Sequence, residues 1–159
     1  MKQPGLEQIK DIDANVDLLI EHASHTTATF PESTADLCIL TAHASANTWS
    51  AWAEIADDQG TPVTLSSKFA AQPGHVASML VEEEGQASTL YMVEVAYGVS
   101  KIKIFSCRLQ SELSLVSATQ APRGRGLLIP AGETIYYRAM CQTAGSKTLQ
   151  VNFRYFLHN

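Results

Sequence analysis

Apolar and polar residues alternate along most of this 159-residue chain, and this pattern limits its fold more than any other feature. The C-terminal segment is the clearest case. One set of alternate positions there is apolar or aromatic (Leu149, Val151, Phe153, Tyr155, Leu157), and the set between them is mostly polar (Gln150, Asn152, Arg154, Phe156). Because successive side chains of a β-strand point to opposite faces of a sheet, a period of two predicts a strand with one buried face.

Similar alternation recurs from residue 36 onward. It predicts strands near residues 49–55, 91–97, 101–104 and 135–141, and the continuous apolar run 37–40 is typical of a central strand. Turn signals rich in Gly, Pro, Asp and Ser separate these runs. Because no helical pattern intervenes, the sequence predicts an all-β domain over residues 35–159, an antiparallel β-sandwich or jelly roll of about eight strands.

The first 34 residues differ, and we interpret residues 1–34 as an N-terminal arm. Apolar residues recur there at roughly helical spacing, namely Leu6, Ile9, Val16, Leu19, Ile20 and Ala23, and Asp13 is a suitable N-cap for a short helix. The stretch 22–29 has no helical face, so an extended arm is the alternative. Pro31 ends the segment, since a residue before proline avoids the helical region.

Composition describes a globular chain. It is 45% hydrophobic and 17% charged, which excludes a disordered tail or a charge-rich long helix. Three widely spaced cysteines, Cys38, Cys107 and Cys141, fit reduced, buried thiols better than disulfides. The sequence has neither a run of about 18 apolar residues nor the pattern of a signal peptide, so we expect no membrane association and synthesis in a cytoplasm.

Charge is distributed unevenly along the chain. Residues 1–60 carry ten acidic and two basic side chains, a balance of −8, whereas residues 101–159 carry eight basic and two acidic ones, a balance of +6. Such asymmetry is typical of an acidic surface that meets a basic one, on the same chain or on a neighbour. The overall pI near 5.4 argues against a direct nucleic-acid binder.

No catalytic constellation stands out. His22 and His25 share a helical spacing beside Glu21, but no third or fourth ligand lies nearby, so we expect no metal site. The chain contains neither a Gly-x-Ser-x-Gly elbow nor a glycine-rich phosphate loop before a helix. We therefore expect no enzyme activity, no catalytic residue and no cofactor.

The segment 126–133 predicts a tight corner between two strands, with Pro130 in the second position of a type I turn and Gly132 in the fourth. It looks like the second motif of cupins, but Ile135 stands where cupins carry a metal-binding histidine, and no His-x-His pair lies upstream. A cupin-like or sugar-binding protein without that metal is one alternative. Its ligand would lie inside the sandwich, lined by Tyr91, Tyr97, Tyr137 and Arg138.

Residues 47–52, 91–98 and 129–138, together with the last alternating strand, resemble small jelly-roll or β-sandwich virion proteins of tailed bacteriophages. These include head decoration (cement) proteins and neck or tail accessory proteins, and the likeness covers about residues 36–157. It implies a structural protein located in the virion. Its partners would be its own copies, with a trimer favoured, and the major capsid protein or another virion protein. We favour a capsid decoration role, and a neck or tail role is the alternative.

We expect large or charged residues on the arm, on outward strand positions and in a basic loop to form the interface of such a protein. They are Leu6, Ile9 and Phe30 on the arm, Trp52, Tyr136, Met140 and Phe156 on strands, and Arg123 and Arg125 in the loop 122–126.

Overall fold

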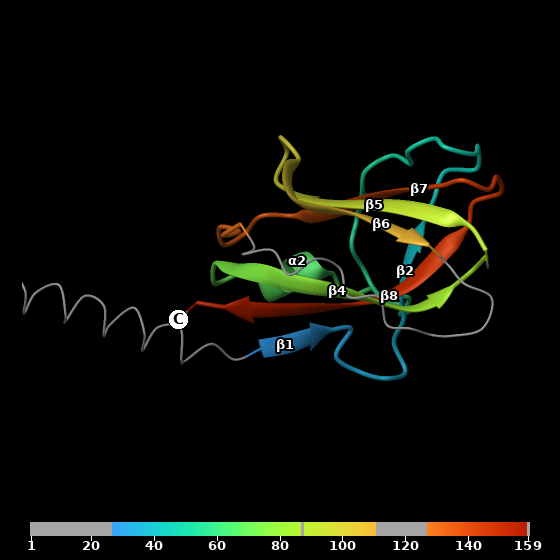
Figure 1. The fold of residues 1–159 in the computed structure, drawn as a ribbon. Helices are drawn as coiled ribbons and strands as arrows, with labels where there is room; N and C mark the ends of the chain where they lie inside the picture. The colour runs from blue at the N-terminus through green and yellow to red at the C-terminus, as the bar shows by residue number, and fades with distance from the viewer. Residues whose placement is uncertain (1–26, 87, 111–126, 159) are drawn as a thin grey trace, which may run out of the picture.

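A computed structural model describes residues 27–86, 88–110 and 127–158. Two four-stranded antiparallel sheets pack face to face (Figure 1), which confirms the expected all-β sandwich of about eight strands. The elements are β1 (Thr27–Phe30), β2 (Cys38–Thr41), β3 (Ala53–Glu54), α2 (Leu65–Lys68), β4 (Gly74–Glu84), β5 (Leu90–Tyr97), β6 (Ile102–Gln110), β7 (Ile135–Cys141) and β8 (Thr148–Leu157).

The first sheet, sheet A, is built around β8. On one side β4 pairs with β8 over nearly its whole length, and on the other side β1 and β2 lie end to end along it. The second sheet, sheet B, has the order β3-β7-β5-β6. The outer surfaces of the two sheets are called face A and face B below.

The strand pairs are nested in the manner of a jelly roll. From the chain ends inward, β2 pairs with β8 and β3 pairs with β7. Next, Gly74 at the start of β4 forms a bridge with Ile129, and innermost β5 pairs with β6. The contacts of β8 with β4 and of β7 with β5 then close the two sheets. A single long ribbon rolled in this way gives the double-sheet architecture that the alternating sequence predicts.

The core lies between the sheets and follows the predicted alternation. In β7 every residue from Ile135 to Cys141 at an odd position is buried, and those between are half-buried on face B. In β8 the odd positions Leu149 to Tyr155 are likewise buried. The short helix α2, capped by the Thr64 side chain, adds Leu65 and is followed by Phe69, both 0% exposed, at one end of the core.

Two predicted strands differ from expectation. The run 37–40 is not a central strand, because among the described residues β2 has β8 as its one strand neighbour and Ile39 is 41% exposed. The other side of β2 has an isolated bridge from Cys38 to Asp57. Of residues 49–55, only Ala53–Glu54 form a strand. The residues before them follow the edge of β7 through single contacts, such as that from the Ser50 amide to the Ala139 carbonyl at 2.9 Å.

The segment interpreted as an arm contributes a strand to the sandwich. Residues 27–30 form β1, and Phe30 is 1% exposed in the core, opposite Phe153 of β8. Its expected place at an interface is therefore wrong, because the aromatic ring fills the space between the sheets. Leu6, Ile9, Arg123 and Arg125 lie outside the described residues.

The predicted corner before β7 is present. Gly132 has φ 78°, a left-handed conformation that glycine adopts more readily than other residues. A Cβ atom at this position would meet no atom within 4 Å. Backbone conformation, and not space, is what favours glycine there.

Candidate binding face

Three of the expected interface residues meet on face B. Tyr136 and Met140 are outward residues of β7, and Trp52 lies just before β3, which pairs with β7. All three are half-buried. Phe156 is separate from them, on face A, where its ring lies 4.9 Å from that of His75.

Strand register arranges the outward side chains of face B in rows. From β7 through β5 to β6 the rows are Met140–Met92–Arg108, Arg138–Glu94–Ser106 and Tyr136–Ala96–Lys103. Side chains directly opposite on neighbouring strands lie about 5 Å apart, so each row is one strip of contact. The result is a surface with methionines at one end, charges in the middle and an aromatic ring at the other end.

Glu94 lies at the centre of face B and is 6% exposed. Its two carboxylate oxygens contact different cations, Lys103 Nζ at 2.5 Å and the Arg138 guanidinium at 2.6 Å. Burial by itself raises the pKa of Glu94, but the hydrogen bonds and positive charges of Lys103 and Arg138 outweigh it and lower the pKa below its ordinary value. The carboxylate is therefore a charged link between β5, β6 and β7.

Aromatic rings hold the cations of face B in fixed positions. The Arg138 guanidinium contacts two indoles, 4.6 Å from the centroid of the Trp49 ring and 4.7 Å from that of the Trp52 ring. Lys101 Nζ lies 3.2 Å from the centroid of the Tyr136 ring. Such cation–π contacts contribute about 0.5–1 kcal/mol each at exposed sites, so they favour one arrangement of these cations in the unbound protein.

The methionine end of face B is hollowed. A depression of about 330 Å³ is lined by Asn47, Leu90, Met92, Arg108, Met140 and Gln142. Arg108 is exposed, and the described part of the chain gives it no ion-pair partner. An apolar floor beside a cation suits a ligand that combines an apolar side chain with a carboxylate.

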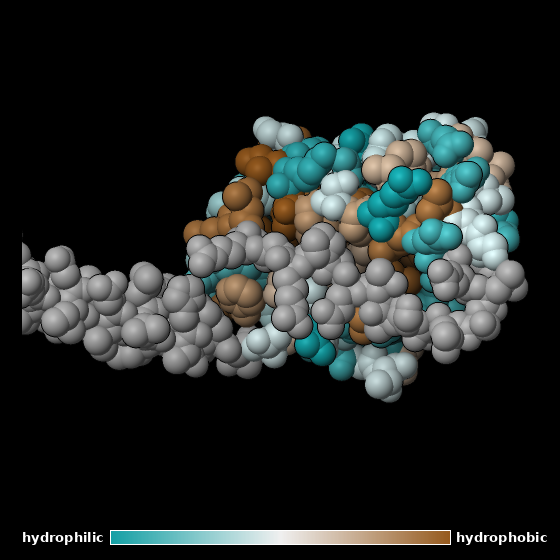
Figure 2. All heavy atoms as spheres, viewed as in Figure 1, coloured by the Kyte–Doolittle hydropathy of each residue, from teal (hydrophilic) through white to brown (hydrophobic). Residues whose placement is uncertain are grey.

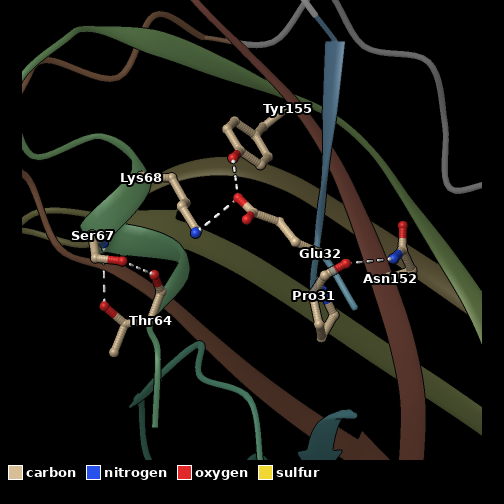
Figure 3. A network of polar contacts seen from close by, with 7 residues as sticks. All are labelled: Pro31, Glu32, Thr64, Ser67, Lys68, Asn152 and Tyr155. Atoms are coloured by element: carbon tan, nitrogen blue, oxygen red, sulfur yellow. Dashed lines mark hydrogen bonds and ion pairs between the residues drawn. The ribbon is translucent and has the colours of Figure 1, made fainter. Parts of the chain in front are cut away.

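Face A carries a second hollow, of about 470 Å³, beside the connection from β1 to β2. Figure 3 shows how that connection is fastened to the sandwich. The Glu32 carboxylate contacts Lys68 Nζ at 2.8 Å and accepts a hydrogen bond from the Tyr155 hydroxyl at 3.3 Å, and the Pro31 carbonyl accepts one from Asn152. The acidic residues that line this hollow are Glu32, Asp36 and Glu82. Each already contacts a side chain of the fold, namely Lys68, Gln59 and Gln150 in that order.

One end of the sandwich is apolar. Figure 2 shows hydrophobic side chains gathered around the β5–β6 turn. Val99 at that turn is 92% exposed, and Ile102, Leu127 and Leu128 are 45–49% exposed. The turn lies against the chain before β7, because the Gly98 amide donates to the Thr134 carbonyl at 2.9 Å.

The four residues expected to line an internal ligand site do not line one pocket. Tyr91, Tyr97 and Tyr137 pack in the core, at 1%, 8% and 8% exposure. Arg138 points the opposite way, onto face B, where its charge meets Glu94.

Two further kinds of titratable side chain, cysteine and histidine, occur outside face B. All three cysteines are free and buried, which confirms the expected reduced thiols. His43 Nδ1 accepts a hydrogen bond from the Ser45 amide, whereas His22 and His25 lie outside the described residues. Across residues 27–86, 88–110 and 127–158, no group of three His, Cys, Asp or Glu side chains is placed to hold a metal ion.

Sequence reasoning missed three residues that organise face B: Trp49, Glu94 and Arg108. Glu94 had a signal, since it is the one charged residue in the apolar run 91–97 and occupies an outward position. A period of two places Trp49 on the same side as the buried Ile55, but residues 49–52 form no strand and the Trp49 ring lies beside Arg138 on face B. Arg108 follows the buried Cys107, and only the pairing of β6 with β5 places it beside Met92.

Comparison with known proteins identifies no relative of this chain. No family model matches it, no curated protein matches its sequence, and no solved structure matches its fold. In the part of the chain that the structure describes, no helix has the length and apolarity to cross a membrane.

Proposed function

We propose that this protein is a structural component of a tailed-bacteriophage virion, a head decoration protein that assembles with copies of itself and bridges neighbouring major capsid subunits. It binds and converts no substrate. The observation that supports this function best is face B, where Trp52, Tyr136 and Met140 gather around a fixed ion pair. Trp, Tyr, Arg and Met are the residues enriched at protein interfaces.

The rigidity of face B suits a building block. Its cations are already held by Glu94, Tyr136 and the indoles, so little side-chain entropy is lost on binding. On a symmetric capsid lattice many copies bind at once, and modest contacts add up through avidity. A neck or tail position in the virion would use the same surface.

A particle-binding assay tests this proposal. We expect the wild-type protein to sediment with heads of its own phage that were assembled without it. The double variant Trp52→Ala/Tyr136→Ala should bind at least tenfold more weakly, because truncation of interface aromatics commonly costs about 2 kcal/mol. The control Val63→Ala changes an exposed apolar residue away from face B and should bind normally.

Two results would contradict the proposal. One is a wild-type protein that fails to bind heads, tails or necks of its phage. The other is a folded double variant that binds as tightly as the wild type, which would remove face B from the contact. Imaging of labelled protein on the particle separates a head position from a neck or tail position.

A further inference from the structure

We infer that face B binds the acidic, amphipathic N-terminal segment, residues 6–23, of a neighbouring copy of this protein. The inference deepens the proposed function by naming one partner of face B, and it rests on that surface being an assembly contact. The match has three parts: the chemistry of the segment, the chemistry of the face, and the length of chain between the segment and β1.

The N-terminal segment combines apolar and acidic side chains. Residues 6–23 carry five carboxylates (Glu7, Asp11, Asp13, Asp17 and Glu21) against Lys10 alone, a balance of −4. Leu6, Ile9, Val16, Leu19, Ile20 and Ala23 recur at helical spacing between them. A helix with such a stripe recognises a groove that has an apolar floor and basic margins.

Face B offers this floor and these margins. Met92 and Met140 line its hollow, and methionine adapts to the shape of an incoming apolar side chain. Face B carries four cations (Lys101, Lys103, Arg108 and Arg138) and two carboxylates (Glu54 and Glu94), so its net charge is +2. Lys101, Lys103 and Arg138 have partners within the face, which leaves Arg108 as the cation at the rim of the hollow for a carboxylate of the segment.

The length of the connection favours a neighbouring copy over the same chain. From Ala23 to Thr27, the first residue of β1, four Cα–Cα steps span at most about 14 Å. Helical residues before Ala23 add only about 1.5 Å each, so Leu19 and Ile20 lie within about 20 Å of Thr27. A path from β1 around the edge of the sandwich to the middle of face B already covers about 10 Å between the sheets and about 7 Å across one and a half strand spacings.

The hollow lies farther along the strands, because Met92 and Met140 are at one end of sheet B and Tyr97 and Ile135 at the other. Thr27 begins near the end of Ile135, since Thr27 and Gly74 both pair with the C-terminal end of β8 and Gly74 bridges Ile129. The five residues from Ile135 to Met140 add about 17 Å of strand, so Leu19 and Ile20 of the same chain do not reach the hollow.

Exchange of this segment is a head-to-tail contact, since it joins two different surfaces of the same protein. Such contacts close into a ring when the rotation between copies permits, and otherwise extend into a chain. A ring of three would give the trimer that the virion resemblance implies.

Two full-length variants test the contact. Arg108→Glu reverses the exposed cation of face B and leaves the segment intact, whereas Leu19→Asp/Ile20→Asp removes the apolar stripe and leaves face B intact. We expect light scattering to find an oligomer for the wild type and a folded monomer for each variant alone. An equimolar mixture of the two should form a heterodimer, because one intact segment then meets one intact face.

A photo-crosslinking residue placed at Met140 identifies the contact directly. We expect it to crosslink to peptides from residues 6–23, and mixed isotope-labelled and unlabelled chains should show that the crosslink joins two copies. Arg154→Glu, an exposed charge reversal on face A, is the matched control and should leave the oligomer unchanged.

Several results would overturn the inference: a strictly monomeric wild type, variants that associate normally, a mixture that stays monomeric, or crosslinks confined to one chain. None of these readouts involves a phage particle. Failure here with normal particle binding would remove the self-contact through face B and leave the bridging of capsid subunits standing. Segment exchange without particle binding would leave the self-contact and remove the role in the virion.

Discussion

Glu94 is a single carboxylate in contact with cations from two neighbouring strands. Its partners Lys103 and Arg138 differ from it in exposure, with 53% and 30% of their side chains accessible against 7% for Glu94. Water therefore screens the cations more than the acid. The loss of the acid would leave Arg138 beside two indoles without its counter-charge, a more costly change than loss of a surface ion pair.

We predict that Glu94→Gln lowers the free energy of unfolding by about 2 kcal/mol at pH 7. Because folding lowers the pKa of Glu94, the wild type has this stability above the ordinary pKa and loses it as pH falls through the lower, folded-state pKa. The difference between wild type and variant should therefore shrink in acid. Urea unfolding at pH 7 and at pH 3 measures it, with Glu54→Gln on the same face as control. An equal difference at both pH values would contradict the role of the charge.

Gly74 is required for space where β4 begins. A Cβ atom there would overlap the backbone carbonyl oxygen of Phe156, and backbone atoms of a central strand cannot move aside easily. We predict that Gly74→Ala lowers the free energy of unfolding by about 2 kcal/mol or more. Gly60→Ala is the control, because a Cβ there meets nothing within 4 Å. Thermal unfolding of both variants checks this, and equal melting temperatures would show that the strand can shift.

At the scale of elements, alternation identified the long strands and failed for the short ones. β7 and β8 have seven and ten residues, enough for a period of two to stand out. β1 has four residues, Thr-Ala-Thr-Phe, with one large apolar side chain. Nothing local distinguishes such a segment from an extended arm, because the strand with which it pairs, β8, is more than 120 residues away in sequence.

We predict that Phe30→Ala lowers the free energy of unfolding by about 3–5 kcal/mol, since it opens a cavity between the sheets at a residue that is 1% exposed. Ile39→Ala on β2, which pairs with the same strand β8, should cost less than about 1 kcal/mol because Ile39 is 41% exposed. Urea denaturation of both proteins provides the comparison. Similar losses would mean that β1 adds little to the sandwich.

At the scale of the whole molecule, the sequence predicted the members of face B better than their grouping. Alternation assigned Tyr136, Arg138 and Met140 to one side of a strand, and Trp52 was expected at an interface. The sequence could not show that these residues surround Glu94, because that depends on the register of β5 against β6 and β7. Alternation fixes the face on which a side chain lies, whereas the turns and the packing between the sheets fix which residues lie opposite each other.

The three cysteines report on the integrity of the whole sandwich, because they come from both sheets and are all buried. Cys38 belongs to sheet A, whereas Cys107 and Cys141 belong to sheet B. Burial, together with the negative charges of Asp57, Glu82 and Asp58, raises the pKa of Cys38 to about 12. Burial also raises the pKa of Cys107 to about 11. Both thiols are therefore protonated and covered at neutral pH.

We predict that Ellman's reagent labels none of the three thiols in the native protein at pH 8 on a timescale of minutes, and all three after unfolding in urea. Because folding raises these pKa values above the ordinary 9.0, their contribution to stability is complete below pH 9 and is lost as pH rises toward 11–12. Labelling should accelerate over that range as the unfolded state becomes more populated. Mass spectrometry of partly labelled protein distinguishes the mechanisms. Molecules with zero or three labels indicate opening of both sheets together, whereas early single labelling at Cys107 alone would mean that the β6 edge opens independently.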